Sequence, residues 1–116
     1  MIVAVQGTSS FDDYQVFLRA MGVAMSMMSK DDKEFLIYSA GPVRINSMVS
    51  EFSGVSEKSF KSRGMKIKFF KVPSSYIEEN LDYVNYLAFF SKPKESATRL
   101  VKEAEDKNIE IGLFRY

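Results

Sequence analysis

The sequence predicts an α/β domain built on a five-stranded parallel sheet, and three observations support this prediction. Short apolar runs of strand type alternate with longer segments in which apolar residues recur at helical spacing. Each apolar run ends in a turn of small or polar residues. The length of 116 residues and the hydrophobic content of 46% suit a single domain, residues 1–116, with one core. Strands that alternate with helices indicate a parallel sheet covered by helices on both faces.

The predicted strands differ in the strength of their signal. The first is a continuous apolar run, which is typical of a central strand buried on both faces. The fourth is the richest in β-branched and aromatic residues and is the strongest of the set. In chain order, the strands are expected at residues 2–5, 34–38, 65–70, 83–90 and 109–114.

The predicted helices lie between these strands. The first, residues 12–29, has Ser10 or Asp12 as a candidate N-cap, and the second covers residues 43–61. A helical turn is expected around residues 76–80. The last helix is expected to start at Pro93, and its apolar positions recur with a spacing of three and four: Ala97, Leu100, Val101 and Ala104.

The alternating order predicts a sheet with strands arranged 3-2-1-4-5 and right-handed crossovers. The direction of winding then reverses between the first and fourth strands. Ligands of open α/β sheets bind beyond the carboxyl ends of the strands at such a point. This rule selects the loops of residues 7–11 and 91–95, with the loop of residues 39–44 beside them.

Composition excludes several kinds of chemistry. The chain has no His and no Cys, which removes imidazole bases, thiolate nucleophiles, disulfides and the usual zinc or haem ligands. We therefore expect no cofactor and no metal. The net charge of +1 gives no global attraction to nucleic acid or membranes. No basic leader and no apolar run of membrane-spanning length is evident, so we expect a cytoplasmic protein without a membrane partner.

Residues 3–14, Val-Ala-Val-Gln-Gly-Thr-Ser-Ser-Phe-Asp-Asp-Tyr, resemble the opening of the SLOG superfamily of small Rossmann-like proteins. In that superfamily, which includes the LOG and DNA-processing groups, a strand ends in Gly-Ser-Arg-x-Phe-x-Asp-Tyr. Residues 39–46 fall where the family has Ser-Gly-Gly-Ala-x-Gly-Ala-Asp, and residues 87–90 fall where it has the strand before a Gly-rich turn. This chain departs from the pattern: Ser9 replaces the Arg, Asn46 replaces the Asp, and residues 91–95 lack the glycines.

The resemblance implies a three-layer Rossmann-like fold that binds a nucleotide or nucleotide-derived phosphate ligand. Some members cleave the glycosidic bond of nucleoside monophosphates, with a Pro-Gly-Gly-x-Gly-Thr motif that this sequence lacks. We therefore expect binding without turnover. The ligand-binding candidates come from three loops: Gly7, Thr8, Ser9, Ser10 and Phe11; Gly41 and Arg44; Ser91 and Lys92. A purely structural role, as a turn and a helix cap, is the alternative for the first loop.

Two other functions remain open from the residues. The first is a nucleotide glycosidase or phosphate hydrolase, for which Glu95 is the only carboxylate near a candidate loop. The second is a protein or single-stranded nucleic-acid interaction module. Its basis is a run of basic residues with phenylalanines between them. The structural alternative is that these charges protect an edge strand from aggregation. The basic residues are Lys58, Lys61, Arg63, Lys66, Lys68 and Lys71.

The helix expected at residues 12–29 predicts a homodimer or higher oligomer. Its apolar arc is wider than one sheet face needs, because a second apolar row lies roughly opposite the first. Four methionines within eight residues suit an adaptable contact surface. The second row consists of Val16, Ala20, Val23 and Met27.

Overall fold

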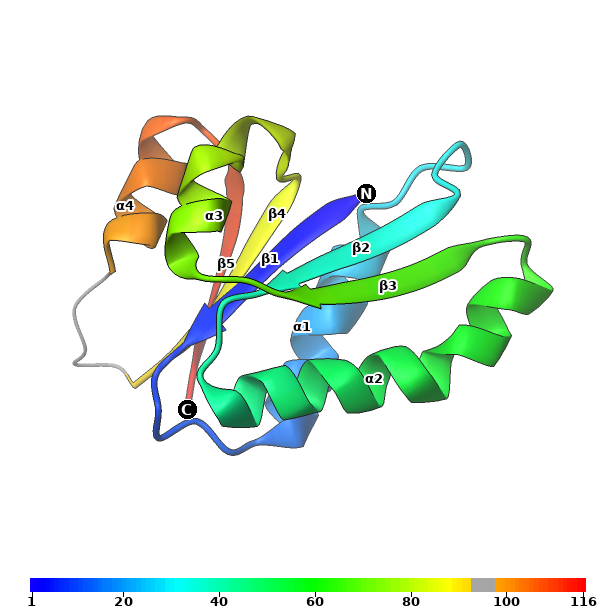
Figure 1. Cartoon of the computed structure of the whole chain (residues 1–116), viewed down its shortest axis with the longest axis horizontal. Coiled ribbons are helices and arrows are strands. Elements are labelled where there is room, and N and C mark those ends of the chain that lie inside the picture. The colour runs from blue at the N-terminus through cyan, green and yellow to red at the C-terminus, as the bar shows by residue number, and fades with distance from the viewer. Residues whose placement is uncertain (93–97) are drawn as a thin grey trace.

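The computed structural model describes residues 1–92 and 98–116 and contains a five-stranded sheet in which all strands are parallel. The strand order is β3-β2-β1-β4-β5, which confirms the predicted fold class and order. The sheet is drawn with its flanking helices in Figure 1. Its strands are β1 (Ile2–Gly7), β2 (Glu34–Ser39), β3 (Lys66–Lys71), β4 (Tyr86–Ser91) and β5 (Glu110–Arg115).

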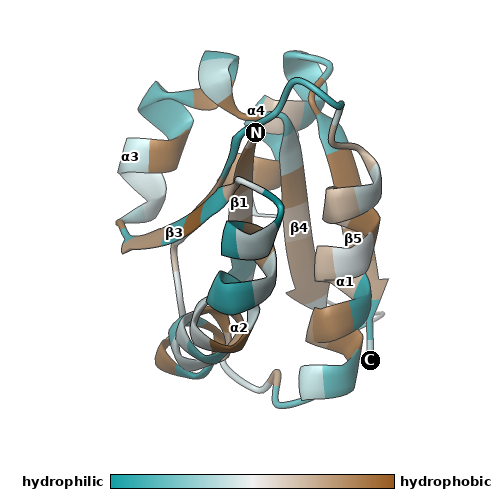
Figure 2. Ribbon diagram, turned by 90° about the vertical axis from the view of Figure 1, so that its right-hand side faces the viewer, coloured by the Kyte–Doolittle hydropathy of each residue, from teal (hydrophilic) through white to brown (hydrophobic). Residues whose placement is uncertain are grey.

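Helices cover both faces, so the domain has three layers (Figures 1 and 2). One face carries α1 (Tyr14–Ser26) and α2 (Val43–Ser62), and the other carries α3 (Ser74–Glu79) and α4 (Arg99–Asp106). A 3-10 turn, η1 (Leu81–Tyr83), joins α3 to β4. The mostly apolar central strands lie between these layers (Figure 2). This arrangement follows from a parallel sheet whose crossovers all have the same hand.

Each face of the sheet has its own apolar core. On the α1 and α2 face, buried aromatic side chains dominate, among them Phe17, Phe35 and Phe90. On the α3 and α4 face, the core is smaller and is centred on Leu87 and Phe89 of β4. All six residues of β4 are buried, which explains why this strand has the most apolar sequence.

The winding of the chain reverses between β1 and β4. These two strands are neighbours, with Gly7 in register with Phe90 at their carboxyl ends. The helix after β1 lies on one face and the helix after β4 lies on the other. The first and third candidate loops therefore leave the sheet at adjacent points, as predicted from the strand order.

Several boundaries differ from the predictions, and the structure gives a local cause at three places. The fourth strand begins at Tyr86 instead of residue 83, because Leu81–Tyr83 forms η1. The N-cap of α1 is Asp13, whose carboxylate accepts bonds from the N–H groups of Gln15 and Val16 at 3.1 Å. The last helix begins after Thr98, which has an extended backbone and is its N-cap. Pro93, the residue predicted to start this helix, lies outside the described residues.

Within the described residues, β3 and β5 are the two edge strands of the sheet, and each pairs with a neighbouring strand on one side only. The prediction that the Lys-rich segment forms an edge strand is thus confirmed. No helix within residues 1–92 and 98–116 combines the length and apolar character needed to cross a membrane.

Candidate functional site

The first candidate loop begins at Gly7, where the chain packs too closely for any side chain. A Cβ atom at this position would lie 2.5 Å from Cδ1 of Ile45 and 2.9 Å from the carbonyl oxygen of Phe90. The glycine thus lets β1 approach both α2 and β4. The N–H of Gly7 donates to the carbonyl of Gly41 at 3.3 Å, so the first and second candidate loops are in direct contact.

The rest of the first loop is tied to the end of β4. The N–H of Thr8 donates to the carbonyl of Phe90 at 2.9 Å, and the N–H of Phe11 donates to the carbonyl of Thr8 at 3.2 Å. The ring of Phe11 is fully buried and stacks on Phe90 with ring centroids 4.5 Å apart. Phe11 therefore anchors the loop in the core and does not face a ligand. Ser9 and Ser10 are exposed at the tip.

The hydroxyl groups of the first loop have a partner that the sequence did not suggest. The phenol of Tyr116 is hydrogen-bonded to the hydroxyls of Thr8 and Ser10, at 2.5 and 2.6 Å. Its ring also packs edge-on against Phe11 with centroids 5.0 Å apart. The residue after β5 thus holds the loop after β1. No local motif marks Tyr116, because the contact spans more than 100 residues of sequence.

The second candidate loop supplies a cation that is already paired. Gly41 is buried and has φ of 85°, a left-handed conformation that favours glycine. Arg44, in the first turn of α2, places its guanidinium 2.5 Å from the carboxylate of Asp12. The anion expected to face Arg44 is therefore a side chain from the first loop. Both groups of this pair are more than half exposed.

A surface cavity of about 370 Å³ lies between the starts of α1 and α2. Its charged groups are Arg44 and two carboxylates, those of Asp12 and Glu51. The phenol of Tyr14 also lines it, and burial together with the charge of Glu51 raises the pKa of that phenol. The carboxylates of this recess outnumber its one guanidinium, so a phosphate could enter it only by displacing Asp12 from Arg44.

In the third candidate loop, Ser91 has a structural partner. Its side chain is buried, and its hydroxyl accepts a hydrogen bond from Nη1 of Arg115 at 2.7 Å. The same nitrogen donates to the carbonyl of Lys92 at 3.1 Å, and Lys92 is exposed. Glu95, the candidate acid or base of a hydrolase, lies outside the described residues.

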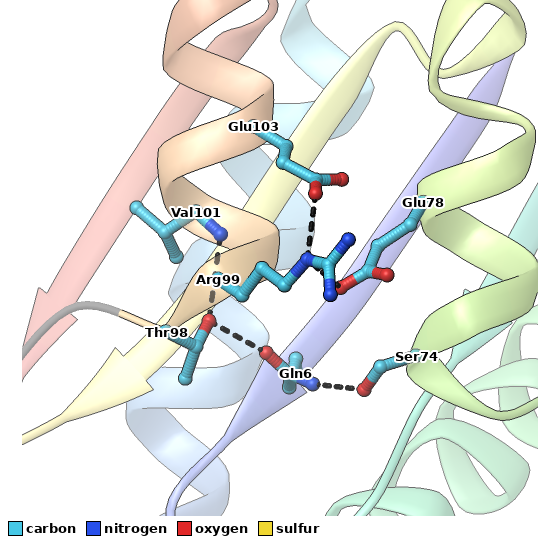
Figure 3. Close-up of polar contacts among 7 residues, drawn as sticks. All are labelled: Gln6, Ser74, Glu78, Thr98, Arg99, Val101 and Glu103. Atoms are coloured by element: carbon cyan, nitrogen blue, oxygen red, sulfur yellow. Dashed lines mark hydrogen bonds and ion pairs between the residues drawn. The ribbon is translucent and has the colours of Figure 1, made fainter.

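A second polar cluster lies at the carboxyl end of β1 on the opposite face of the sheet (Figure 3). Nε2 of Gln6 donates to the hydroxyl of Ser74, and the hydroxyl of Thr98 donates to Oε1 of Gln6 at 3.0 Å. Thr98 also caps α4 by accepting from the N–H of Val101. One amide side chain therefore connects the starts of α3 and α4. A polar residue at the end of an apolar strand was the only sequence signal for Gln6.

Arg99, beside this cluster, is also paired with carboxylates (Figure 3). Its Nε donates to Glu103 at 2.8 Å and lies 3.9 Å from a carboxylate oxygen of Glu78. The hydrogen bond from Arg99 to Glu103, together with the charges of Glu103 and Glu78, raises the pKa of its guanidinium. Arg44 and Arg99 thus have acidic partners, which an anionic ligand would have to displace.

The predicted site residues separate into two groups in the structure. Gly7, Thr8 and Gly41 meet at the switch point between β1 and β4, with Ser9 and Ser10 exposed beside them. Phe11 and Ser91 form the second group, in which the side chains are buried and have internal partners. No group of three or more acidic side chains placed to hold a metal ion occurs within the described part of the chain. Comparisons of the sequence and structure with models of protein families, with curated proteins and with solved structures gave no match.

Proposed function

We propose that this chain binds a nucleotide or nucleotide-derived phosphate ligand at the carboxyl ends of its strands, in the cytoplasm, as a divergent member of the SLOG superfamily. The observation that carries the proposal is the meeting of the first and second loops at the point where the winding reverses. Gly7 and Gly41 are hydrogen-bonded there, and the exposed hydroxyls of Ser9 and Ser10 lie at the same edge. Ligands of open α/β sheets bind at this position.

Hydroxyl groups are donors available to a ligand at this edge, beside the exposed cations of Lys92 and Arg115. Thr8 and Ser10 share the phenol of Tyr116, and Ser74 and Thr98 share the amide of Gln6 on the other face. Hydroxyl groups can rotate from these internal partners toward a phosphate or ribose oxygen. Arg44 would bind an anion by exchanging Asp12 for it.

Binding without turnover fits the chemistry of these residues. The chain has no His or Cys, and the groups gathered at the edge are hydroxyls, an amide and charged side chains. Hydroxyls alone are weak nucleophiles and need a neighbouring base. Such a set can orient and hold a phosphate ligand, which is the behaviour expected of a sensor or sequestering protein.

Thermal unfolding in the presence of mono-, di- and cyclic nucleotides and ADP-ribose tests the proposal. A ligand at a hundredfold excess over its Kd adds about 2.7 kcal/mol to the free energy of unfolding. For a domain of this size, we expect a rise in Tm of roughly 10 °C. Ser10→Ala should reduce the shift, while Ser50→Ala, an exposed serine of α2, should leave it unchanged. If no nucleotide raises Tm, the proposal is wrong.

Chromatography of any ligand that raises Tm separates binding from turnover. Recovery of the intact ligand after long incubation supports a binding protein. Appearance of free base or inorganic phosphate would overturn that part of the proposal, and loss of the product in Glu95→Gln would then assign the hydrolysis to Glu95.

We also propose that the chain forms a homodimer through α1. Of the second apolar row, Ala20 is buried and Val16 is half-buried, but Val23 and Met27 are each 41% exposed. Gly22 is exposed beside them, and a Cβ atom added to it would meet nothing within 4 Å. Because Gly22 has no side chain, a second helix can approach the exposed apolar side chains beside it closely.

A further inference from the structure

The outer half of the sheet on the α3 side is not covered by a helix among the described residues. The core on this face consists of side chains from β1, β4, α3, η1 and α4, together with Val84. No side chain of β3 belongs to it, although Lys66, Lys68 and Phe70 point to this face, opposite the buried Ile67. In Figure 1, β2 and β3 extend beyond α3 and α4.

Three aromatic side chains gather at the carboxyl end of this open face. Phe70 and Tyr76 are 43% and 40% exposed, and Tyr38 lies half-buried between them. The ring centroid of Tyr38 is 5.7 Å from that of Phe70 and 5.5 Å from that of Tyr76. The three rings come from β2, β3 and α3, so the fold and not the local sequence brings them together. Two of them present aromatic surface to solvent.

Exposed cations line the strand that carries Phe70. Lys66 and Lys68 precede it at alternate positions on the same face, in register with Glu34 and Leu36 of β2. Lys66 and Lys68 also line a groove of about 580 Å³ around the edge of the sheet, together with Lys61 and Glu57 of α2. The floor of this groove includes Met65 and Ile67.

The segment that includes β3 is strongly basic. Residues 57–71 contain six cations and one carboxylate, whereas the whole chain has a net charge of only +1. Within residues 1–92 and 98–116, none of these six cations lies within ion-pair distance of a carboxylate. Lysines on an edge strand prevent edge-to-edge aggregation. That role does not account for the cations of α2, Lys58 and Lys61, or for the exposed rings.

We propose that the open face of β2 and β3 binds single-stranded nucleic acid. The groove at the β3 edge, lined by Lys61, Lys66 and Lys68, would hold the phosphate backbone. Phe70 and Tyr76 on the adjoining open face would stack on bases. A basic track combined with exposed aromatic rings is the way proteins bind single strands without reading their sequence. This surface is centred on β3, two strands away from β1 in the sheet, and its lysines and Phe70 take no part in the nucleotide site proposed above.

Fluorescence anisotropy of labelled oligothymidine and oligoadenosine RNA, measured with the full chain at several salt concentrations, tests this proposal. For a single strand, the slope of log K against log salt is about −0.7 for each phosphate neutralised. Contacts from three lysines therefore predict a slope of roughly −2. Lys66→Gln and Lys68→Gln should each make the slope shallower by about 0.7. Lys102→Gln, an exposed lysine of α4, should leave it unchanged.

The stacking part of the proposal needs its own variants. Phe70→Leu and Tyr76→Leu keep apolar bulk but remove the aromatic ring, and each should weaken single-strand binding by roughly fivefold to a hundredfold. Leu113→Ala on β5, where the side chain is 46% exposed, is the matched control and should have no effect. Circular dichroism melts of every variant confirm that the fold is retained.

Competition distinguishes the proposed partner from other polyanions. Single strands should displace the probe better than duplex DNA of the same length or heparin. Equal competition by heparin, no loss in the two leucine variants, or no binding at 50 mM salt would each overturn the proposal. Nucleotide-induced shifts in Tm should be the same in Phe70→Leu as in the wild type. Loss of single-strand binding in this variant can therefore be distinguished from a failure of the proposed nucleotide site.

Discussion

The guanidinium of Arg44 lies 2.5 Å from the carboxylate of Asp12, and this ion pair joins the start of α2 to the loop that follows β1. The pair stands at the edge of the sheet where the strand order reverses. It explains how a cation is tolerated in the first turn of a helix, where the helix dipole opposes it. In the absence of a ligand, Asp12 is therefore the anionic partner of Arg44 at this edge.

Arg44→Ala should lower the free energy of unfolding by less than about 1 kcal/mol, because exposed ion pairs contribute little. A double-mutant cycle with Asp12→Ala, followed by urea unfolding, should give a coupling energy that falls as salt rises. A coupling energy of several kcal/mol would show that the pair is not the exposed contact described. If Arg44 exchanges Asp12 for a phosphate, Asp12→Asn should tighten nucleotide binding.

Gly7→Ala should destabilise the fold by about 1–3 kcal/mol, because the new methyl group would overlap Ile45 and the carbonyl of Phe90. The matched control is Gly54→Ala in the interior of α2, where a Cβ meets nothing within 4 Å. That change should stabilise the protein by roughly 0.5–1 kcal/mol. Urea unfolding of both variants checks the prediction, and equal effects of the two changes would contradict it.

Thr98→Ala should cost about 1 kcal/mol, because it removes the cap of α4 and the donor to Gln6. Thr98→Ser keeps the hydroxyl and should retain most of the stability. Thermal unfolding of the two variants gives the comparison. If alanine and serine behave alike, the hydroxyl does not cap the helix in solution.

Tyr86→Phe should make stability less dependent on pH in the alkaline range. Burial, and then the nearby charge of Glu110, raises the pKa of the Tyr86 phenol above its usual value of 10.0. The unfolded chain therefore loses this proton first, and the stability that the phenol contributes is complete below pH 10 and falls as pH rises through the folded pKa.

Urea unfolding between pH 8 and pH 11 measures this effect, with Tyr83→Phe as the control because Tyr83 is 69% exposed. The wild type and the control should lose stability alike, and Tyr86→Phe should lose less. Part of the alkaline loss should remain in this variant, because burial also raises the pKa values of Tyr14 and Tyr38. Identical pH profiles for all three proteins would refute the assignment.

Val23→Gln combined with Met27→Gln should convert the proposed dimer to a monomer, since the side chains of Val23 on α1 and of Met27 at its C-cap are both exposed. Sedimentation velocity at micromolar concentration measures the assembly state. Val55→Gln is the control, because Val55 is 69% exposed on α2 and should not affect assembly. A wild-type chain that sediments as a monomer at these concentrations would rule out the α1 dimer.

The local pattern of the sequence was sufficient to predict the architecture. The spacing of apolar residues within a short segment indicates a strand or a helix. The order of these elements along the chain then allows only a few topologies. The positions of β1, α2 and α3 and the strand order were predicted on this basis and are confirmed. The differences lie at boundaries such as the starts of β4 and α1, where a 3-10 turn and a side-chain cap decide the outcome.

The sequence by itself determined which strands lie next to each other and which loops meet at the edge of the sheet. Only the tertiary structure decided the partners of individual side chains: Tyr116 with Thr8 and Ser10, and Gln6 with Ser74 and Thr98. These partners are between 68 and 108 residues apart. Such contacts depend on strand register and on where each helix starts, and no local periodicity encodes either quantity.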